Sequence, residues 1–552
     1  MKIKLLIILT LLGLVMYSQT PITSGIDWEV LNITSNNELN APNTLLYGPD
    51  GYLWITERVG KKVVKIDPNG SIPISKTTML DLTGVVYQSV TQDGLMGMAI
   101  HPDLYTDPNT STNNYVYVVY TYDRDPGTGI DSNIRIARYT YNSGAGNLDS
   151  GSETIIIDGI EAGEDHNSGK ITIGPDLKLY FTIGEHGANR GTRACNEIRA
   201  QYLPTSDSDY SDYKGKVLRL NLDGTIPSDN PTLNGVKSHV HTYGHRNAQG
   251  IVFGSNGKLY ASEHGDRTDD ELNIIYAGKN YGWPLIAGYA DDSAYAYFNW
   301  SAYPGDCGSY DFNNPPGPTI AESTSVLTMP DFEPPIGTYN STITTTGSDA
   351  YLTWPTPAPS SIDIYEAGKI PNWGTSLLIP TLKHGTIYRA KLNVAGDALE
   401  EGTFEIFHSS NDRYRDIALD SDGVTIYAIT DISGQTTGSP TGTTSVPLTN
   451  KGVVMKIQYT GTTLSKNNVT QSEFSLIPNP ASNDVKFNFN AVKESFVNLK
   501  IFDLHGRMVE QINNILNNHI LNTSDFANGL YFVKINNENN KETEIKKLII
   551  AH

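Results

Sequence analysis

One sequence unit recurs four times, and each copy begins at a tight turn and runs into an apolar strand pattern. The copies are residues 48–57 (GPDGYLWITE), 174–184 (GPDLKLYFTIG), 254–263 (GSNGKLYASE) and, more weakly, 420–430 (DSDGVTIYAIT). Asp-Gly and Asn-Gly pairs favour β-turns, and the alternating residues after them predict strands. Strands that carry cations follow most copies, as at residues 61–66 and 217–221. Recurring hairpins of this kind predict a β-propeller.

The composition agrees with an all-β fold and argues against a nucleic-acid partner. The 552 residues include 50 glycines and 32 tyrosines, which favour turns and strands. The formal net charge of −20 is opposite to that of most nucleic-acid-binding proteins. A site for an anionic ligand must therefore be a local basic pocket in an acidic shell.

Residues 1–19 are predicted to be a signal peptide. Lys2 and Lys4 precede a short apolar run at residues 5–16, and Ser18 is a small residue suited to cleavage. This run is too short to span a bilayer, and no later stretch is apolar enough for a membrane helix. We therefore expect an exported protein without a membrane span.

The chain has two cysteines, Cys195 and Cys307. In an exported protein such a pair forms either a disulfide or two free thiols, and the sequence leaves both readings open. Two cysteines alone do not make a zinc site.

The composition changes near residues 460–472, which are polar and rich in turn formers. Short alternating strands follow, and we expect a linker at 461–472 and a small β-sandwich at 473–552. Its IPNP, FDLHGR and GLYFVKI segments resemble those of the C-terminal sorting domain of the type IX secretion pathway. The resemblance implies export through an outer membrane by that machinery. A carbohydrate-binding or adhesive sandwich is the alternative.

Four polar segments in the propeller region carry cations or histidines beside apolar runs. They are residues 164–170 (EDHNSGK), 243–250 (YGHRNAQG), 381–385 (TLKHG) and 412–416 (DRYRD). Propeller loops gather at one end of a central channel, so residues distant in sequence meet there. The segments therefore predict one site for a multiply anionic ligand, with a histidine left as a base.

Residues 39–459 closely resemble the soluble PQQ-dependent glucose dehydrogenases, also called glucose/sorbosone dehydrogenases. Ordered motifs carry the resemblance, among them QDGLMG at 92–97, Asp165-His166, GKVLRLNLDG at 215–224, GHRN at 244–247, NYGWP at 280–284 and RYRD at 413–416. It implies an all-β fold, with a six-bladed β-propeller at 20–460 before the C-terminal sandwich. It also implies PQQ and Ca²⁺ as cofactors at one end of the channel.

PQQ is a flat quinone with three carboxylates, which suits arginine and lysine partners. The resemblance assigns Lys383, Arg413 and Arg415 to these carboxylates, with Arg246, Asn247 and Thr356 beside them. Alone, Arg413-Tyr-Arg415 also reads as an exposed strand with two solvated arginines. His166 is the predicted general base, grouped with Arg246 and with Asp165, which we expect to orient it or to raise its proton affinity.

Calcium is implied at two places. Main-chain carbonyls of Gly265 and Asp266 match the ligands beside the cofactor, although the family normally has proline at the second position. A structural calcium would involve Ala287, Tyr289, Asp291 and Glu322, and a solvated acidic turn is the alternative. Residues 269–271 (DDE) are interpreted as blade structure.

The predicted sugar contacts are Gln92, Asp165, Tyr351 and Trp354. Arg190 and Gly191 replace an amide and a leucine of the family, within an insertion at 187–211. Arg190 leads to the hypothesis of an acidic or larger saccharide.

The sequence thus predicts an exported PQQ- and Ca²⁺-dependent dehydrogenase that oxidises a glucose-like aldose to its lactone and passes electrons to an external acceptor. A homodimer is left open. The alternatives are a non-catalytic carbohydrate-binding propeller and a calcium-dependent propeller lactonase, which would need carboxylates and asparagines around one metal.

Overall fold

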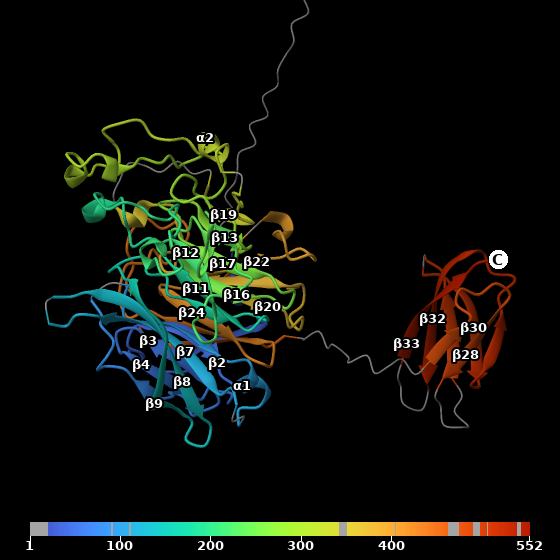
Figure 1. Cartoon of the computed structure of the whole chain (residues 1–552). Helices are drawn as coiled ribbons and strands as arrows, with labels where there is room; N and C mark the ends of the chain where they lie inside the picture. Colours follow the sequence, from blue (N-terminus) through green and yellow to red (C-terminus); the bar gives the residue numbers. More distant parts are fainter. Residues whose placement is uncertain are drawn as a thin grey trace, which may run out of the picture. The chain divides into compact units, whose positions relative to one another are not determined.

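The chain divides into two compact units, Met1–Leu464 and Ser465–His552, each of which is described by itself (Figure 1). The computed structural model describes residues 20–552 except 90–91, 110–111, 128, 330, 342–349, 403, 462–473, 490–496, 505 and 538–542. The predicted signal peptide and, apart from residue 461, the predicted linker lie outside the described residues.

Six four-stranded antiparallel sheets form the described part of the first unit. They are β2 (Pro42–Tyr47), β3 (Leu53–Glu57), β4 (Lys62–Ile66), β5 (Thr77–Asp81); β6 (Leu95–Ile100), β7 (Tyr115–Asp123), β8 (Ser132–Asn142), β9 (Asn147–Glu161); β10 (Ile171–Ile173), β11 (Lys178–Ile183), β12 (Lys216–Asn221), β15 (Val240–Tyr243); β16 (Ala248–Phe253), β17 (Leu259–Glu263), β18 (Asp270–Ile274), β19 (Gly337–Tyr339); β20 (Asp363–Tyr365), β21 (Ser376–Pro380), β22 (Thr386–Lys391), β23 (Glu405–Ser409); and β24 (Tyr414–Leu419), β25 (Thr425–Thr430), β26 (Val454–Tyr459), β1 (Trp28–Asn32). Shorter elements are the hairpin β13 (Thr232–Leu233) and β14 (Val236–Lys237) and the helices α1 (Asp103–Thr106) and α2 (Glu322–Val326).

The structure confirms the hairpin that was predicted for the recurring sequence unit. Its four copies end in β3, β11, β17 and β25, each the second strand of its sheet. The turn before each strand needs a positive φ, which Gly51 (76°), Gly257 (77°) and Gly423 (69°) adopt without strain. In the remaining copy Leu177 takes φ 54° at this place, while the Asp176 carboxylate accepts the Lys178 N–H at 3.3 Å. The Asx-type turn therefore persists without glycine.

Contacts between the first strands of the sheets run in an unbroken circuit. β2 contacts β6, β6 contacts β10, β10 contacts β16, β16 contacts β20, β20 contacts β24, and β24 contacts β2. The last sheet also joins the two ends of the unit, because β1 pairs along its whole length with β26. Loops at one end of these strands can therefore converge on one site.

Apolar side chains fill the space between neighbouring sheets, whereas polar groups lie between the first strands. One core unites Tyr117 of β7 with Phe181 of β11, both fully buried. Near the first strands, Lys170 Nζ lies 2.8 Å from Asp416 Oδ2 and donates to Asn43 O at 2.9 Å. Burial lowers the pKa of Lys170, and Asp416 opposes that shift by favouring the charged ammonium.

The Lys170–Asp416 pair gives a stability prediction. Asp416→Asn removes the anion that balances a buried ammonium, so we expect a loss of about 3–5 kcal/mol in the free energy of unfolding. The double variant Lys170→Met/Asp416→Leu should recover much of this loss, because no buried charge remains. Urea denaturation measures both. Equal stability of Asp416→Asn and the parent protein would contradict the prediction.

The second unit has two sheets around one apolar core. One contains β27 (Phe474–Ile477), β28 (Asp484–Phe489) and β31 (His519–Asn522), and the other contains β30 (Met508–Ile515), β29 (Val497–Phe502), β32 (Gly529–Asn537) and β33 (Thr543–Ile550). Val485 and Phe487 of the first sheet pack in one cluster with Leu499, Ile501 and Val533 of the second. Among all described residues of the chain, no helix is long and apolar enough to cross a membrane.

Candidate active site

Predicted site residues, most of them in loops between the strands, line one cavity of about 480 Å³. Its lining includes Gln92, Asp165, His166, Arg190, Gly191, Arg246, Gly265, Asp266, Tyr351, Trp354, Thr356 and Arg413. Asn247, Lys383 and Arg415 are buried, and in the sequence each lies within two residues of a residue that lines the cavity. Ala287, Tyr289, Asp291 and Glu322 are not part of this lining.

His166 is oriented by Glu185, a residue that the sequence analysis missed. Its Nδ1 lies 2.6 Å from Glu185 Oε1, and the other carboxylate oxygen accepts the Ala188 N–H at 2.7 Å. Asp165, which was expected to orient the imidazole, instead accepts the backbone N–H of His166 at 3.0 Å. Asp165 therefore caps its own turn, where His166 has φ 48°, and the hydrogen bond to the imidazole comes from Glu185. With Nδ1 facing Glu185, Nε2 is the nitrogen left for a ligand in the cavity.

Arg415 in β24 is buried and Arg413 in the preceding loop is half-buried, so the alternative of a strand with two solvated arginines is wrong. Arg415 is 9% exposed and pairs with Asp431 at 2.6 Å, while Arg413 Nη1 donates to Gln435 O at 2.6 Å. Burial alone would raise the pKa of Asp431, but Arg415 and Arg413 hold it below its usual value. Lys383 Nζ donates to the carbonyls of Trp354 and Thr356, and burial lowers its pKa to about 8.

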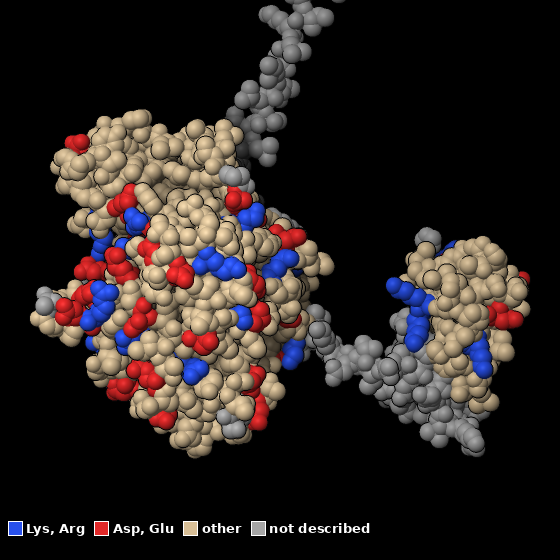
Figure 2. Space-filling view, viewed as in Figure 1, with Lys and Arg blue, Asp and Glu red and all other residues tan. Residues whose placement is uncertain are grey.

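Several buried donors around the cavity have no hydrogen-bond acceptor within the described part of the chain. They are Arg246 Nε, Asn247 Nδ2, Arg413 Nε and Arg415 Nε. A buried donor without an acceptor is costly, so these groups fit a ligand that supplies anionic oxygens. Basic and acidic side chains intermingle on the face of the first unit shown in Figure 2. The basic groups of the site are instead buried or half-buried side chains around the cavity.

Arg190 is already neutralised. Its guanidinium pairs with the Asp266 carboxylate, donates to Asp266 O at 3.2 Å, and lies 4.3 Å from the Trp354 ring centroid. Burial would raise the pKa of Asp266, but Arg190 and Arg246 hold it below its usual value. The same carboxylate lies 3.6 Å from Arg246 Nη2, so one anion faces two guanidinium groups, and the acidic or larger saccharide stays a hypothesis.

The expected structural calcium residues form a loop tied by Glu322. Glu322 accepts the N–H groups of Ala287 at 2.9 Å and Asp292 at 3.1 Å, and burial raises its pKa to about 8. Asp269, whose pKa burial raises to about 7, packs against Gly288 in the same loop. The nearby charges of Asp270 and Asp291 add to the rise in the pKa of Asp269, and a dication would offset that repulsion. No group of three or more His, Cys, Asp or Glu side chains arranged for a metal occurs among the described residues, so any ion here must use main-chain oxygens as well.

The two cysteines form a disulfide, which decides between the two readings left open above. Cys195, in the insertion at 187–211, is bonded to Cys307, 112 residues later. Asn189 adds a second tie between the same segments, because its amide accepts from Trp300 N at 2.7 Å and donates to Phe298 O at 2.8 Å. The insertion is therefore fixed to the loop that follows Trp283.

We expect the double variant Cys195→Ser/Cys307→Ser to lose about 2–4 kcal/mol in the free energy of unfolding, because the disulfide closes a long loop. Guanidinium denaturation of the oxidised parent and the variant measures the difference. A variant as stable as the oxidised parent would contradict this expectation.

Two family models match the chain. Residues 39–300 and 325–438 match the Glucose / Sorbosone dehydrogenase model. Residues 475–551 match the Secretion system C-terminal sorting domain model. The second match identifies a type IX secretion sorting domain, so the protein is exported to the cell surface or released.

Similar proteins support the match to the Glucose / Sorbosone dehydrogenase model. The chain is 38% identical over 487 residues to quinoprotein glucose dehydrogenase B of Acinetobacter calcoaceticus, covering 83% of this chain and 98% of that protein. The PQQ-bound aldose sugar dehydrogenase of Streptomyces coelicolor shares the fold, with a TM-score of 0.52 at 24% identity over 78% of this chain and 97% of that one. Apo aldose sugar dehydrogenase of Escherichia coli gives a TM-score of 0.53 at 21% identity over 78% and 99%. The chain belongs to the glucose/sorbosone dehydrogenase family of quinoprotein oxidoreductases.

Proposed function

We propose that the protein is a PQQ- and Ca²⁺-dependent dehydrogenase that oxidises an aldose at the anomeric carbon to its lactone and passes the electrons to an external acceptor. One observation carries the proposal. The cavity unites an imidazole held by a carboxylate, His166–Glu185, with buried arginine donors that lack acceptors. A base beside a polyanion site is what this reaction needs.

The scaffold of the proposal is a closed six-bladed propeller at 20–460. The six four-stranded sheets and the circuit of contacts from β2 back to β2 support it, and β1 supplies the closing strand of the last blade. The two sheets around one core support a C-terminal β-sandwich at 473–552.

His166 acts as the base in this proposal. In this proposal Glu185 accepts a hydrogen bond from Nδ1–H, which fixes the tautomer and leaves Nε2 to take the proton of the anomeric hydroxyl. The resulting imidazolium is stabilised by the carboxylate 2.6 Å away. Gln92, Asp165, Tyr351 and Trp354 line the same cavity and would hold the sugar. Bound PQQ supplies a quinone that accepts the hydride from C1.

The residues proposed to bind the cofactor have hydrogen-bond donors that are buried or that lack an acceptor among the described residues. Arg246, Asn247, Thr356, Lys383, Arg413 and Arg415 would hold the PQQ carboxylates and carbonyls. Carbonyls of Gly265 and Asp266 would bind the calcium ion that polarises the quinone. Ala287, Tyr289, Asp291 and Glu322 would hold a second, structural calcium.

The test is dye-linked oxidation of a panel of aldoses, with PQQ and Ca²⁺ each added or omitted. We expect activity to need both additions, and His166→Ala to lower kcat by about 10²–10⁴-fold. Glu185→Gln keeps the shape but presents an amide to Nδ1, so kcat should fall about tenfold or more. PQQ uptake by both variants is the control for folding. Tight PQQ binding without oxidation of any sugar would refute the substrate, and no PQQ binding would return the protein to the carbohydrate-binding or lactonase alternatives.

The pKa of Lys383 predicts how cofactor affinity depends on pH. This pKa is lowered from 10.5 to about 8, so the ammonium is lost as pH rises through 8. A ligand with three carboxylates should therefore bind the cofactor-free protein more weakly at pH 9 than at pH 7, with proton uptake on binding at pH 8–9.

Calorimetric PQQ titrations in buffers of different ionisation enthalpy measure this proton uptake. Lys383→Met should bind more weakly at pH 7 and show a flatter pH response. An identical pH response of the parent and Lys383→Met would assign the dependence to another group.

A further inference from the structure

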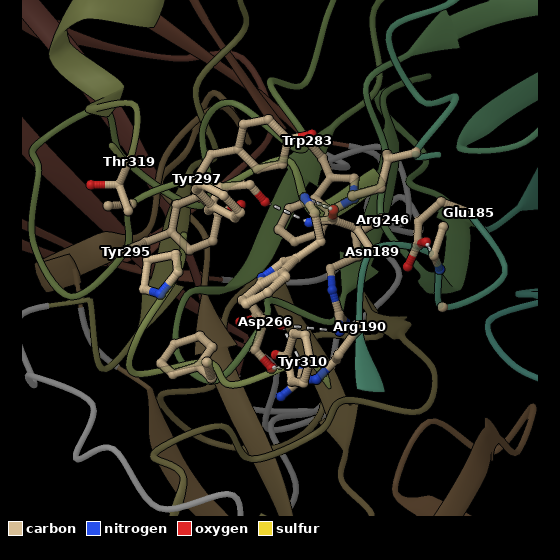
Figure 3. Close-up of a pocket in the computed structure, with 18 of the residues that line it drawn as sticks. Glu185, Asn189, Arg190, Arg246, Asp266, Trp283, Tyr295, Tyr297, Tyr310 and Thr319 are labelled. Atoms are coloured by element: carbon tan, nitrogen blue, oxygen red, sulfur yellow. Dashed lines mark hydrogen bonds and ion pairs between the residues drawn. The ribbon is translucent and has the colours of Figure 1, made fainter. Parts of the chain in front are cut away.

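A second cavity, of about 540 Å³, adjoins the candidate active site (Figure 3). It shares His166, Gly187, Arg190, Arg246 and Asp266 with the first cavity, so these residues, including the Arg190–Asp266 ion pair, lie where the two cavities meet. From there it extends beneath the loop between Trp283 and Thr319. A ligand group in this cavity would therefore lie next to the base.

Aromatic rings form much of its wall. They are Trp283, Tyr295, Tyr297, Trp300, Tyr310 and Phe312. In Figure 3, Tyr295, Tyr297 and Thr319 lie on one side of the cavity, and Glu185, Asn189 and Arg246 lie on the other. The rings pack on one another, since the ring centroids of Trp283 and Tyr295 are 5.6 Å apart and those of Trp300 and Tyr310 are 5.0 Å apart. These aromatic side chains therefore pack against each other and are not isolated aromatic residues on the surface.

The wall is also held in place before any ligand binds. The Cys195–Cys307 disulfide fixes the loop to the insertion at 187–211, and Asn189 bonds the backbone at Phe298 and Trp300. Tyr295 Oη donates to Pro284 O at 2.6 Å. A pre-organised wall lowers the entropic cost of binding.

The polar groups of the cavity indicate an uncharged ligand rich in hydroxyls. Two buried donors, Trp283 Nε1 and Arg190 Nη2, have no hydrogen-bond partner in the described part of the chain, and Trp283 is 7% exposed. Arg190 and Arg246 both face the Asp266 carboxylate, and Glu185 and Asp292 also line the cavity, so its charges are mixed in sign and favour no ionic group of one sign. A pyranose ring fits both features, because its C–H face packs on aromatic rings and its hydroxyls accept from free donors.

We propose that this cavity is a subsite for a second, neutral sugar ring, bonded through its glycosidic oxygen to the ring that is oxidised at His166. The preferred substrate is thus a disaccharide or longer saccharide with a free reducing end. This inference rests on the proposed function. The Arg190–Asp266 pair lies at the boundary between the two rings, where Arg190 Nη2 can donate to an oxygen near the linkage.

Binding is tested first, on the full chain without PQQ or Ca²⁺, with methyl glycosides whose blocked anomeric oxygen prevents oxidation. Tryptophan fluorescence follows titrations with methyl β-cellobioside, methyl β-maltoside and methyl β-glucoside. We expect at least one disaccharide glycoside to bind about tenfold or more tightly than the monosaccharide glycoside. Tyr310→Ala and Trp283→Phe should remove most of that difference, the second by deleting the indole N–H together with part of the ring surface while keeping an aromatic side chain.

Tyr202→Ala is the matched control. Tyr202 is an aromatic residue of the same insertion, is 43% exposed, and does not line the cavity. It should keep the preference of the parent. Equal affinity of the parent for mono- and disaccharide glycosides, or a preference that survives both cavity variants, would overturn the subsite.

Turnover by the PQQ- and Ca²⁺-loaded protein is the second readout. The ratio of kcat/KM for disaccharide to that for monosaccharide should fall about tenfold in Tyr310→Ala and stay at the parent value in Tyr202→Ala. Glycoside binding without oxidation of any sugar would refute the dehydrogenase and leave the cavity as a saccharide site. Oxidation of monosaccharides without disaccharide preference would refute the subsite alone.

Discussion

The pairing of β1 with β26 is the interaction on which the rest of the first unit depends. It places a strand from the start of the unit in the same sheet as three strands from its end. Contacts between the first strands then run from β2 through the other sheets and back to β2. Gln92, His166, Arg246 and Arg413 are far apart in the sequence and line one cavity only because the loops between these strands converge. A chain in which the first and last sheets did not meet would carry the same residues without a site.

Inside this framework the charges are balanced locally. Lys170 is balanced by Asp416, Arg415 by Asp431 and Arg190 by Asp266. In each pair a carboxylate balances the charge of a cation, within a protein of formal net charge −20. Buried polar atoms without a hydrogen-bond partner among the described residues occur at several places, and one group of donors, among them Arg246 Nε and Arg413 Nε, surrounds the cavity. Because buried donors are usually satisfied, this group supports a ligand in the cavity.

Much of the fold and site could be predicted because local sequence carried the signal. Turn residues followed by alternating apolar residues identified the strands that became β3, β11, β17 and β25. Glu185 was missed although it directly follows the second copy of the repeated unit, at the end of β11. Proximity in sequence favoured Asp165, but a side chain one residue away can be turned toward its own backbone, as Asp165 is. Only the placement of β11 beside the 164–170 loop brings Glu185 to the imidazole.

The sequence by itself determined the β-hairpins, the cations and the histidine of the site, and the family and sorting domain to which its motifs belong. These follow from turn chemistry, strand alternation and ordered motifs, which are local properties. The tertiary structure alone decided that Cys195 meets Cys307, that Asp266 neutralises Arg190, and that aromatic residues of the 283–319 segment enclose a second cavity beside His166. Each of these joins segments separated by many residues, and such contacts depend on how the sheets and their loops pack and not on the residues nearby in the chain.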